Sequence, residues 1–402
     1  MKKLLFALLA PLCFGLVSAQ TITIWNTGDD NSAAVLGAAT ELFEESHPGV
    51  TINIQVQSWN DAHAKVLSAA VSGTGPDIIT GGLSWGIEFG ELGGMVDLKE
   101  AAPDVVSKIE GLVQPGVYKS VVPPSGEVYG VPLDLTTFMM VYRPDLLEAA
   151  SAANPPQTWD ELTTALTDLG NKGFAIAWGS ADWLGFYNFL YQAGGTLYDE
   201  GCTTATINSP EGVQAAEFFA SLYNTYGTPV EADLEAGLDN GDYALGYSGN
   251  WLINLGVGRP ELAKKVAYAP IAAGPSGKNT AFIGGSVIGI MANSQNVDLA
   301  AEFIGTLYDS EVVQAMGAVS ATQGGLRIPP VVEFVKQIET NNQDALDALV
   351  AQLEDAAGPP NCSGWEEAAN TVTNQLQEII FNGADVQGAL DKAAEEMNSK
   401  LN

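Results

Sequence analysis

The chain has 402 residues, with 48 acidic and 16 basic side chains and a formal net charge of −32 at pH 7. Nucleic acids and anionic membranes are bound by clustered Lys and Arg, so a chain this acidic is not expected to bind either. Hydrophobic residues make up 46% and charged residues 16%, which excludes a disordered acidic chain. The length predicts two domains or two lobes.

The N-terminus is typical of a secretory signal peptide. A basic start at 1–3 precedes the apolar run 4–17, and small residues before Gln20 allow cleavage after Ala19. The run is too short to span a bilayer, and no later stretch reaches the roughly 18 apolar residues that a spanning helix needs. We therefore expect an exported protein, periplasmic or extracellular. A lipid anchor on Cys13 is the alternative, but Leu12 occupies a position where a small residue is expected.

Two cysteines, Cys202 and Cys362, remain after cleavage. An even pair in an exported protein predicts one disulfide, and two buried thiols are the alternative. There is no CxxC motif, and the only histidines are His47 and His63, so we expect no metal site and no cofactor.

Alternating and helical patterns predict β-α-β-α-β at the start of the chain, which is typical of a parallel sheet with helices on its faces. The later pattern departs from this alternation. The predicted strands or extended segments are 21–25, 50–56, 77–80, 129–132 and 138–142. The predicted helices are 33–45, 60–71 with Asn60 as its N-cap, one opened by a capping box at 158–161, 210–223, 298–308 and one from Trp365 onward.

No flexible linker marks a lobe boundary. The best candidates for chain crossings between lobes are 133–137, 284–288 and 326–330.

Motifs for catalysis are missing from the sequence. It contains no GxSxG, HExxH or P-loop motif and no GxGxxG after a strand. His47 lies in a Pro-Gly turn and His63 in a predicted helix, where a structural or surface role is the simpler explanation. A glycoside hydrolase needs only two carboxylates, which 48 acidic residues satisfy trivially, so that alternative stays open.

Five of the eight tryptophans lie in loops rich in Gly, Ser and Asn: Trp59, Trp85, Trp183, Trp251 and Trp365. An indole next to small polar residues suits a sugar, whose C–H face stacks on the ring while its hydroxyls need polar partners. The alternative is that loop tryptophans cap the core. Trp159, which opens a helix, and Trp178, which ends an apolar run, are expected to be structural.

A series of motifs then follows along nearly the whole mature chain. They are TITIWNTGDD (21–30), GTGPDIIT (73–80), YGVPL (129–133), VYRPDLL (141–147), PPQTWDEL (155–162), INSPEGVQAAEFFASLY (207–223), GDYALGYSGNW (241–251) and AAEFI (300–304). In this order and spacing the chain resembles the extracytoplasmic solute-binding proteins of ABC sugar importers, especially the maltodextrin- and trehalose-binding type.

The resemblance implies an α/β periplasmic-binding-protein-like fold: two α/β lobes with a ligand cleft and a multi-segment hinge that closes on binding. By position, one lobe is 20–134 plus 287–325 and the other is 135–286 plus 326–402. Both cysteines then fall in the second lobe, which favours a disulfide that leaves the hinge free.

The resemblance also implies which residues contact the ligand. Asp29 and Asp30 stand where relatives have an acid followed by a lysine, and Ser84 and Trp85 replace an acid and an arginine. The remaining candidates are the hinge-acid counterparts Asp134 and Thr136, the loop pair Asp182 and Trp183, the stacking residues Trp251 and Trp365, the crossing residues Gly285 and Arg327, and the loop residue Trp59.

The implied function is a non-catalytic, monomeric receptor that delivers a carbohydrate to ABC permease subunits and binds no nucleic acid. The missing lysine argues against assuming a linear maltodextrin; a monosaccharide, a short oligosaccharide or another glycoside is equally compatible. Alternatives are a receptor for a cationic or compatible solute, through cation–π contacts, and an exported glycoside hydrolase.

Overall fold

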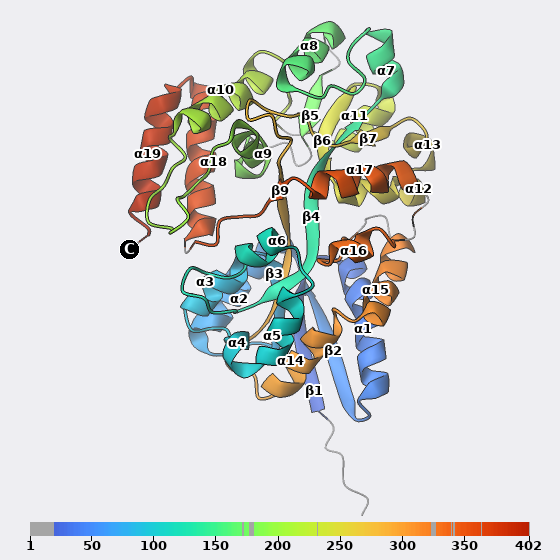
Figure 1. Cartoon of the computed structure of the whole chain (residues 1–402), viewed down its shortest axis with the longest axis vertical. Coiled ribbons are helices and arrows are strands. Elements are labelled where there is room, and N and C mark those ends of the chain that lie inside the picture. Colours follow the sequence, from blue (N-terminus) through green and yellow to red (C-terminus); the bar gives the residue numbers. More distant parts are fainter. Residues whose placement is uncertain are drawn as a thin grey trace, which may run out of the picture.

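The computed structural model describes residues 20–170, 173–176, 181–230, 232–322, 327–338, 340, 342–362 and 364–401. The expected signal peptide, Trp178 and Leu326 lie outside these residues. Two α/β lobes lie one above the other, and strands β4 (Val131–Tyr142) and β8 (Ala281–Ile290) run from one into the other (Figure 1).

The lower lobe in Figure 1 contains the N-terminal elements and two later helices. Its elements are β1 (Gln20–Thr27), α1 (Asp30–Ser46), β2 (Val50–Gln57), α2 (Trp59–Ser72), β3 (Ile78–Gly82), α3 (Trp85–Glu91), α4 (Leu98–Ala101), α5 (Pro103–Glu110), α6 (Pro115–Ser120), α14 (Val297–Thr306) and α15 (Ser310–Thr322).

The upper lobe contains the middle of the chain and the C-terminal helices. Its elements are α7 (Pro144–Ala149), α8 (Trp159–Leu169), β5 (Phe174–Ile176), α9 (Trp183–Ala193), α10 (Pro210–Asn224), α11 (Leu234–Asn240), β6 (Leu245–Gly249), the 3₁₀-helix η1 (Asn250–Asn254), α12 (Leu255–Gly258), α13 (Pro260–Ala263), β7 (Ala267–Ala269), α17 (Gln343–Leu353), α18 (Trp365–Asn382) and α19 (Val386–Asn398). The short elements α16 (Val332–Val335) and β9 (Ala356–Ala357) lie near the junction of the lobes (Figure 1).

The predicted β-α-β-α-β start is confirmed. β1 pairs in parallel with β2 on one side and β3 on the other. Ile22 and Ile24 of β1 are fully buried in the same apolar cluster as Phe43 of α1, which is why the alternating pattern in the sequence follows the observed strand. β8 then adds antiparallel to β3, so the lower sheet is mixed and not purely parallel.

In the upper lobe, β4 pairs antiparallel with β6 and β7, and β5 is parallel to β6. The core of this lobe is rich in aromatic residues. Phe186, Tyr187, Phe219 and Tyr247 are fully buried there. α9, α10, α18 and α19 bring their apolar faces to this cluster, and α10 contacts the other three.

Most of the predicted helix ends agree with the structure, and one cap differs. Thr158 caps α8 by accepting a hydrogen bond from the Glu161 backbone at 3.2 Å. The prediction of Asn60 as the cap of α2 is wrong, because the helix begins one residue earlier, at Trp59. Ser58 has the extended backbone of a cap residue and donates its hydroxyl to Asp61.

Two long strands and one short segment lie side by side where the lobes meet. β4 and β8 are paired from Val131–Ile288 to Thr137–Ile283, and the Leu135 amide donates to the Ile328 carbonyl at 2.8 Å. Gly285 has φ of 133°, and a Cβ at this position would lie 2.1 Å from the Asp134 carbonyl oxygen. Only glycine allows β8 to approach β4 this closely.

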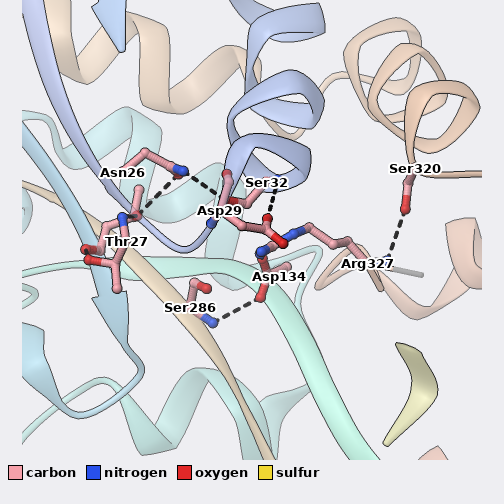
Figure 2. A network of polar contacts seen from close by, with 9 residues as sticks. Asn26, Thr27, Asp29, Ser32, Asp134, Ser286, Ser320 and Arg327 are labelled. Atoms are coloured by element: carbon pink, nitrogen blue, oxygen red, sulfur yellow. Dashed lines mark hydrogen bonds and ion pairs between the residues drawn. The ribbon is translucent and has the colours of Figure 1, made fainter. Parts of the chain in front are cut away.

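Asp134 connects all three of these segments. It is buried on β4, accepts a hydrogen bond from the Ser286 amide of β8 at 3.0 Å, and pairs with the Arg327 guanidinium (Figure 2). The Arg327 amide in turn donates to the Ser320 hydroxyl of α15 at 2.9 Å. A buried carboxylate is costly unless it is paired in this way, so the network holds the three segments in register.

The predicted disulfide is present. Cys202 and Cys362 are bonded, with 5.5 Å between their Cα atoms and 160 residues between them in sequence. Both cysteines pack against the apolar core of the upper lobe. The bond links the segment between α9 and α10 to the segment just before α18, so it stays within this lobe. In the described part of the chain no helix has the length and apolar character to cross a bilayer.

Replacing Arg327 with alanine should lower the free energy of unfolding by about 1–3 kcal/mol, because Asp134 is left buried with one partner fewer. Urea denaturation followed by circular dichroism measures this. Lys264→Ala is the control: its ion pair with Glu261 is exposed, and the loss should stay below about 0.5 kcal/mol. Equal losses in the two variants would contradict the role given to the Asp134–Arg327 pair.

Replacing both Cys202 and Cys362 with serine should destabilise the protein by about 2–5 kcal/mol, since the bond closes a long loop in the unfolded chain. The measurement is the denaturation midpoint of the oxidised protein against that of the double variant. Reduced wild type is the control and should match the variant; a variant as stable as the oxidised protein would show that the bond contributes nothing.

Candidate ligand-binding site

A cavity of about 670 Å³ lies between the lobes and takes its lining from both. The lower lobe supplies the N-terminal ends of α1, α2 and α3 and the end of β3. The upper lobe supplies the N-terminal ends of α9 and α18 together with η1, and β4, β8 and the Arg327 segment supply the remaining wall. The volume of this cavity and its mixture of apolar and polar lining residues are typical of small-molecule binding sites.

Four of the five loop tryptophans stand at the first residue of a helix. Trp59 opens α2, Trp85 opens α3, Trp183 opens α9 and Trp365 opens α18. The fifth, Trp251, is the second residue of η1. All five line the cavity, because these helices begin at the junction of the lobes.

The aromatic walls are held in place by packing. In the upper lobe the rings of Trp183 and Trp365 lie 5.6 Å apart edge to face, and Trp183 makes a similar contact with Phe282. In the lower lobe Trp59 and Trp85 are 5.8 Å apart at 69°. Such contacts restrict the rotamers of the rings, so the surfaces offered to a ligand are largely preformed.

Two glycine-containing strand ends make room for indoles. A Cβ on Gly81 would lie 2.0 Å from the Trp85 ring, and a Cβ on Gly249 would lie 1.5 Å from the Trp251 ring. Each ring therefore packs against a glycine, and a side chain at that position would clash with the indole.

Polar side chains complete the lining. In the described part of the cavity they are Asp29, Asn31, Ser84, Asp134, Thr136, Asn250, Ser286, Arg327 and Glu366. Three of these are carboxylic acids and one is a cation, so the described lining repels anions more than it attracts them. Two of them are oriented by the backbone: an Asp29 carboxylate oxygen accepts from the Ser32 amide at 2.8 Å, and the side-chain Oδ1 of Asn250 accepts from the Thr137 amide at 3.0 Å.

A hydrogen bond at the cavity wall joins the two lobes. The Ser84 hydroxyl of the lower lobe donates to Glu366 Oε1 of the upper lobe at 2.7 Å. Burial raises the pKa of Glu366, against the opposing effect of this hydrogen bond. Behind Trp85, His63 Nε2 lies 2.8 Å from Glu88 Oε2, and this carboxylate raises the pKa of His63.

Eleven of the thirteen candidate contact residues line the cavity: Asp29, Trp59, Ser84, Trp85, Asp134, Thr136, Trp183, Trp251, Gly285, Arg327 and Trp365. Asp30 and Asp182 are not in the lining. Asp30 is the exposed first residue of α1, since the preceding Asp29 takes the cap position. Asp182 caps α9 and accepts from the amides of Leu184 and Gly185, which uses its carboxylate to start the helix.

Several residues of the cavity lining are not among the thirteen candidates. Glu366 and Asn250 are direct neighbours of Trp365 and Trp251, so adjacency to a site tryptophan was an available signal. Phe138 and Phe282 lie on β4 and β8, and only the strand pairing determines that their side chains face the cavity. The other residues missed are Asn31, Gly82, Leu83, Leu184, Gly284, Ser286 and Pro359.

A second hollow of about 460 Å³ adjoins the first and shares Asp134 and Arg327 with it. It is lined largely by apolar residues of α1, α15 and α16 and holds no aromatic pair. Among the described residues no group of three or more His, Cys, Asp or Glu side chains is placed to hold a metal ion.

Comparison with known proteins agrees with the expected family. The model of the bacterial extracellular solute-binding proteins matches residues 26–314. A Brucella abortus protein, named as a binding protein without a stated ligand, is 27% identical over 376 residues, covering 90% of this chain and 88% of that protein. The diacetylchitobiose-binding protein DasA of Streptomyces coelicolor is 24% identical over 325 residues, 75% of this chain and 73% of that protein.

Among solved structures, the sugar-binding protein MalE of Xanthomonas citri superimposes with a TM-score of 0.81 at 24% identity, covering 95% of this chain and 97% of that one. The same two-lobed fold is therefore present in both. With a family model that matches most of the chain and a fold that agrees over nearly all of it, this protein belongs to the bacterial extracellular solute-binding proteins.

Proposed function

We propose that this protein is the substrate-binding component of an ABC importer and captures a monosaccharide, short oligosaccharide or glycoside without chemical change. The observation that carries this proposal is the cavity between the lobes, with aromatic rings on both sides and polar side chains around them. It suits a molecule that has flat C–H faces and hydroxyl groups at its rim.

The distribution of groups supports a neutral sugar. Trp59 and Trp85 of one lobe and Trp183, Trp251 and Trp365 of the other offer stacking surfaces. The acids and amides of the lining accept from and donate to hydroxyl groups. A phosphorylated or acidic sugar would meet three carboxylic acids and one guanidinium in the described lining, which disfavours it.

The named ligand of a family relative points the same way. The Streptomyces coelicolor relative is named as a binding protein for diacetylchitobiose, which is a carbohydrate. We extend only the chemical class to this chain. A shared fold does not fix the identity of the ligand. Calorimetry is therefore needed to identify the sugar and its linkage.

Capture proceeds by lobe closure. The lobes that move are residues 20–134 with 287–325 and residues 135–286 with 326–402, and the strands β4 and β8 connect them. A ligand that touches both lobes binds the closed state more tightly than the open one and shifts the population toward closure. The closed monomer then docks on its permease, after export and removal of the signal peptide at Ala19.

Isothermal titration calorimetry against glucose, galactose, trehalose, maltose, lactose and diacetylchitobiose should give at least one dissociation constant below about 1 mM. Choline and glycine betaine serve as cationic and compatible-solute controls, and glucose 6-phosphate as an anionic control. Binding of the controls alone would refute the sugar assignment. Chromatography of the same mixtures after incubation tests for hydrolysis products, which we expect to be missing.

Trp251→Ala and Trp365→Ala should each weaken sugar binding by at least about 1 kcal/mol, roughly fivefold in the dissociation constant, through lost stacking area. Trp25→Ala is a matched control, since that indole contacts Gln55 and Lys65 outside the cavity. Circular dichroism verifies that each variant is folded. Unchanged affinity in both cavity variants would place the site elsewhere.

A further inference from the structure

Glu366 lines the cavity and connects the two lobes at a point away from the crossing segments. It lies in the first turn of α18 in the upper lobe, and its side chain reaches Ser84 at the start of α3 in the lower lobe. The two residues are 282 positions apart in sequence. Their hydrogen bond therefore exists only while the lobes are close together.

Closure changes the surroundings of this carboxyl group. In the described structure Glu366 is partly buried at the cavity wall, with Ser84 of the opposite lobe against it. Separating the lobes removes this partner and returns the carboxyl group to water. A carboxylate that loses water on closure is penalised relative to its neutral form.

The two charged groups that face Glu366 from the lower lobe act in opposite directions. Glu88 of α3 repels the ionised form and raises the pKa of Glu366, whereas the positive charge of His63 of α2 lowers it. Tyr187 of α9 is close enough to interact, but burial raises its pKa far above the usual value and keeps it neutral. On α18 itself the adjacent Glu367 points away from the cavity and pairs with Lys400 at 3.1 Å.

We propose that Glu366 is a proton-linked closure residue: bringing the lobes together takes up a proton at this carboxyl group, so the closed state and ligand capture are favoured in mildly acidic surroundings. The neutral carboxyl group keeps its hydrogen bond to Ser84, because a carboxylic acid both donates and accepts. The inference rests on the lobe closure of the proposed function but not on the identity of the ligand.

The direction of the pH effect follows from linkage. The pKa of Glu366 is raised above 4.5 in the closed structure, so the penalty is missing below that pH and grows as the pH rises through the raised value. The pKa of His63 is raised above 6.5 by Glu88, so its offsetting charge is fully present below 6.5 and is lost as the pH rises further. Both titrations favour closure at pH 5 over pH 8.

Small-angle X-ray scattering of the protein without added sugar tests the proposal. The ratio of closed to open forms should be at least about twofold larger at pH 5 than at pH 8, because the closed state binds the proton more tightly than the open state. Glu366→Gln, which keeps a neutral hydrogen-bonding group, should be compact at both pH values. Glu367→Gln removes the same charge one residue away and should behave as the wild type.

A scattering profile of the wild type that does not change between pH 5 and pH 8 would overturn the proposal. So would a Glu366→Gln variant that retains the wild-type pH dependence. Titration with maltose at both pH values adds a second readout, in which wild type but not Glu366→Gln binds more tightly at pH 5. The panel of six sugars tests the sugar assignment separately, and the scattering comparison decides the role of Glu366 whether or not maltose binds.

Discussion

Backbone hydrogen bonds between β4 and β8 connect the two lobes, and both strands contribute residues to the cavity between them. Asp134 sits within this pairing and binds Ser286 on one side and Arg327 on the other. Since its carboxylate is buried, losing either partner is costly, and this cost keeps the three crossing segments aligned. Gly285 removes the Cβ that would separate β4 from β8.

From this junction the helices of both lobes present their first residues to the cavity. This arrangement explains why tryptophans that are far apart in sequence form one site: Trp59, Trp85, Trp183 and Trp365 each open a helix. Helix N-termini also offer amide donors and cap side chains, so stacking and hydrogen bonding are available at the same edge. In the proposed mechanism, a ligand that contacts both lobes binds the closed state more tightly than the open state and so favours closure.

The acidity of the chain has two distinct parts. Most of the 48 acidic residues lie outside the cavity lining and contribute to the formal net charge of −32. A few lie in the cavity, where they are held by specific partners: Asp29 by Ser32, Asp134 by Arg327, and Glu366 by Ser84 of the opposite lobe. In the last case the partner belongs to the opposite lobe, and this contact is the basis of the proposed link between the protonation of Glu366 and lobe closure.

The amino-acid sequence by itself determined the order of strands and helices at the start of the chain, the helix cap at Thr158 and the family, because hydrophobic period and capping are local properties. It also identified the loop tryptophans. Only the tertiary structure decided that Asp30 and Asp182 stay out of the cavity and that Phe282 and Glu366 enter it. A strand residue faces the cavity or the core according to pairing register, and the neighbours of Glu366 come from the opposite lobe, so no local pattern could reveal either.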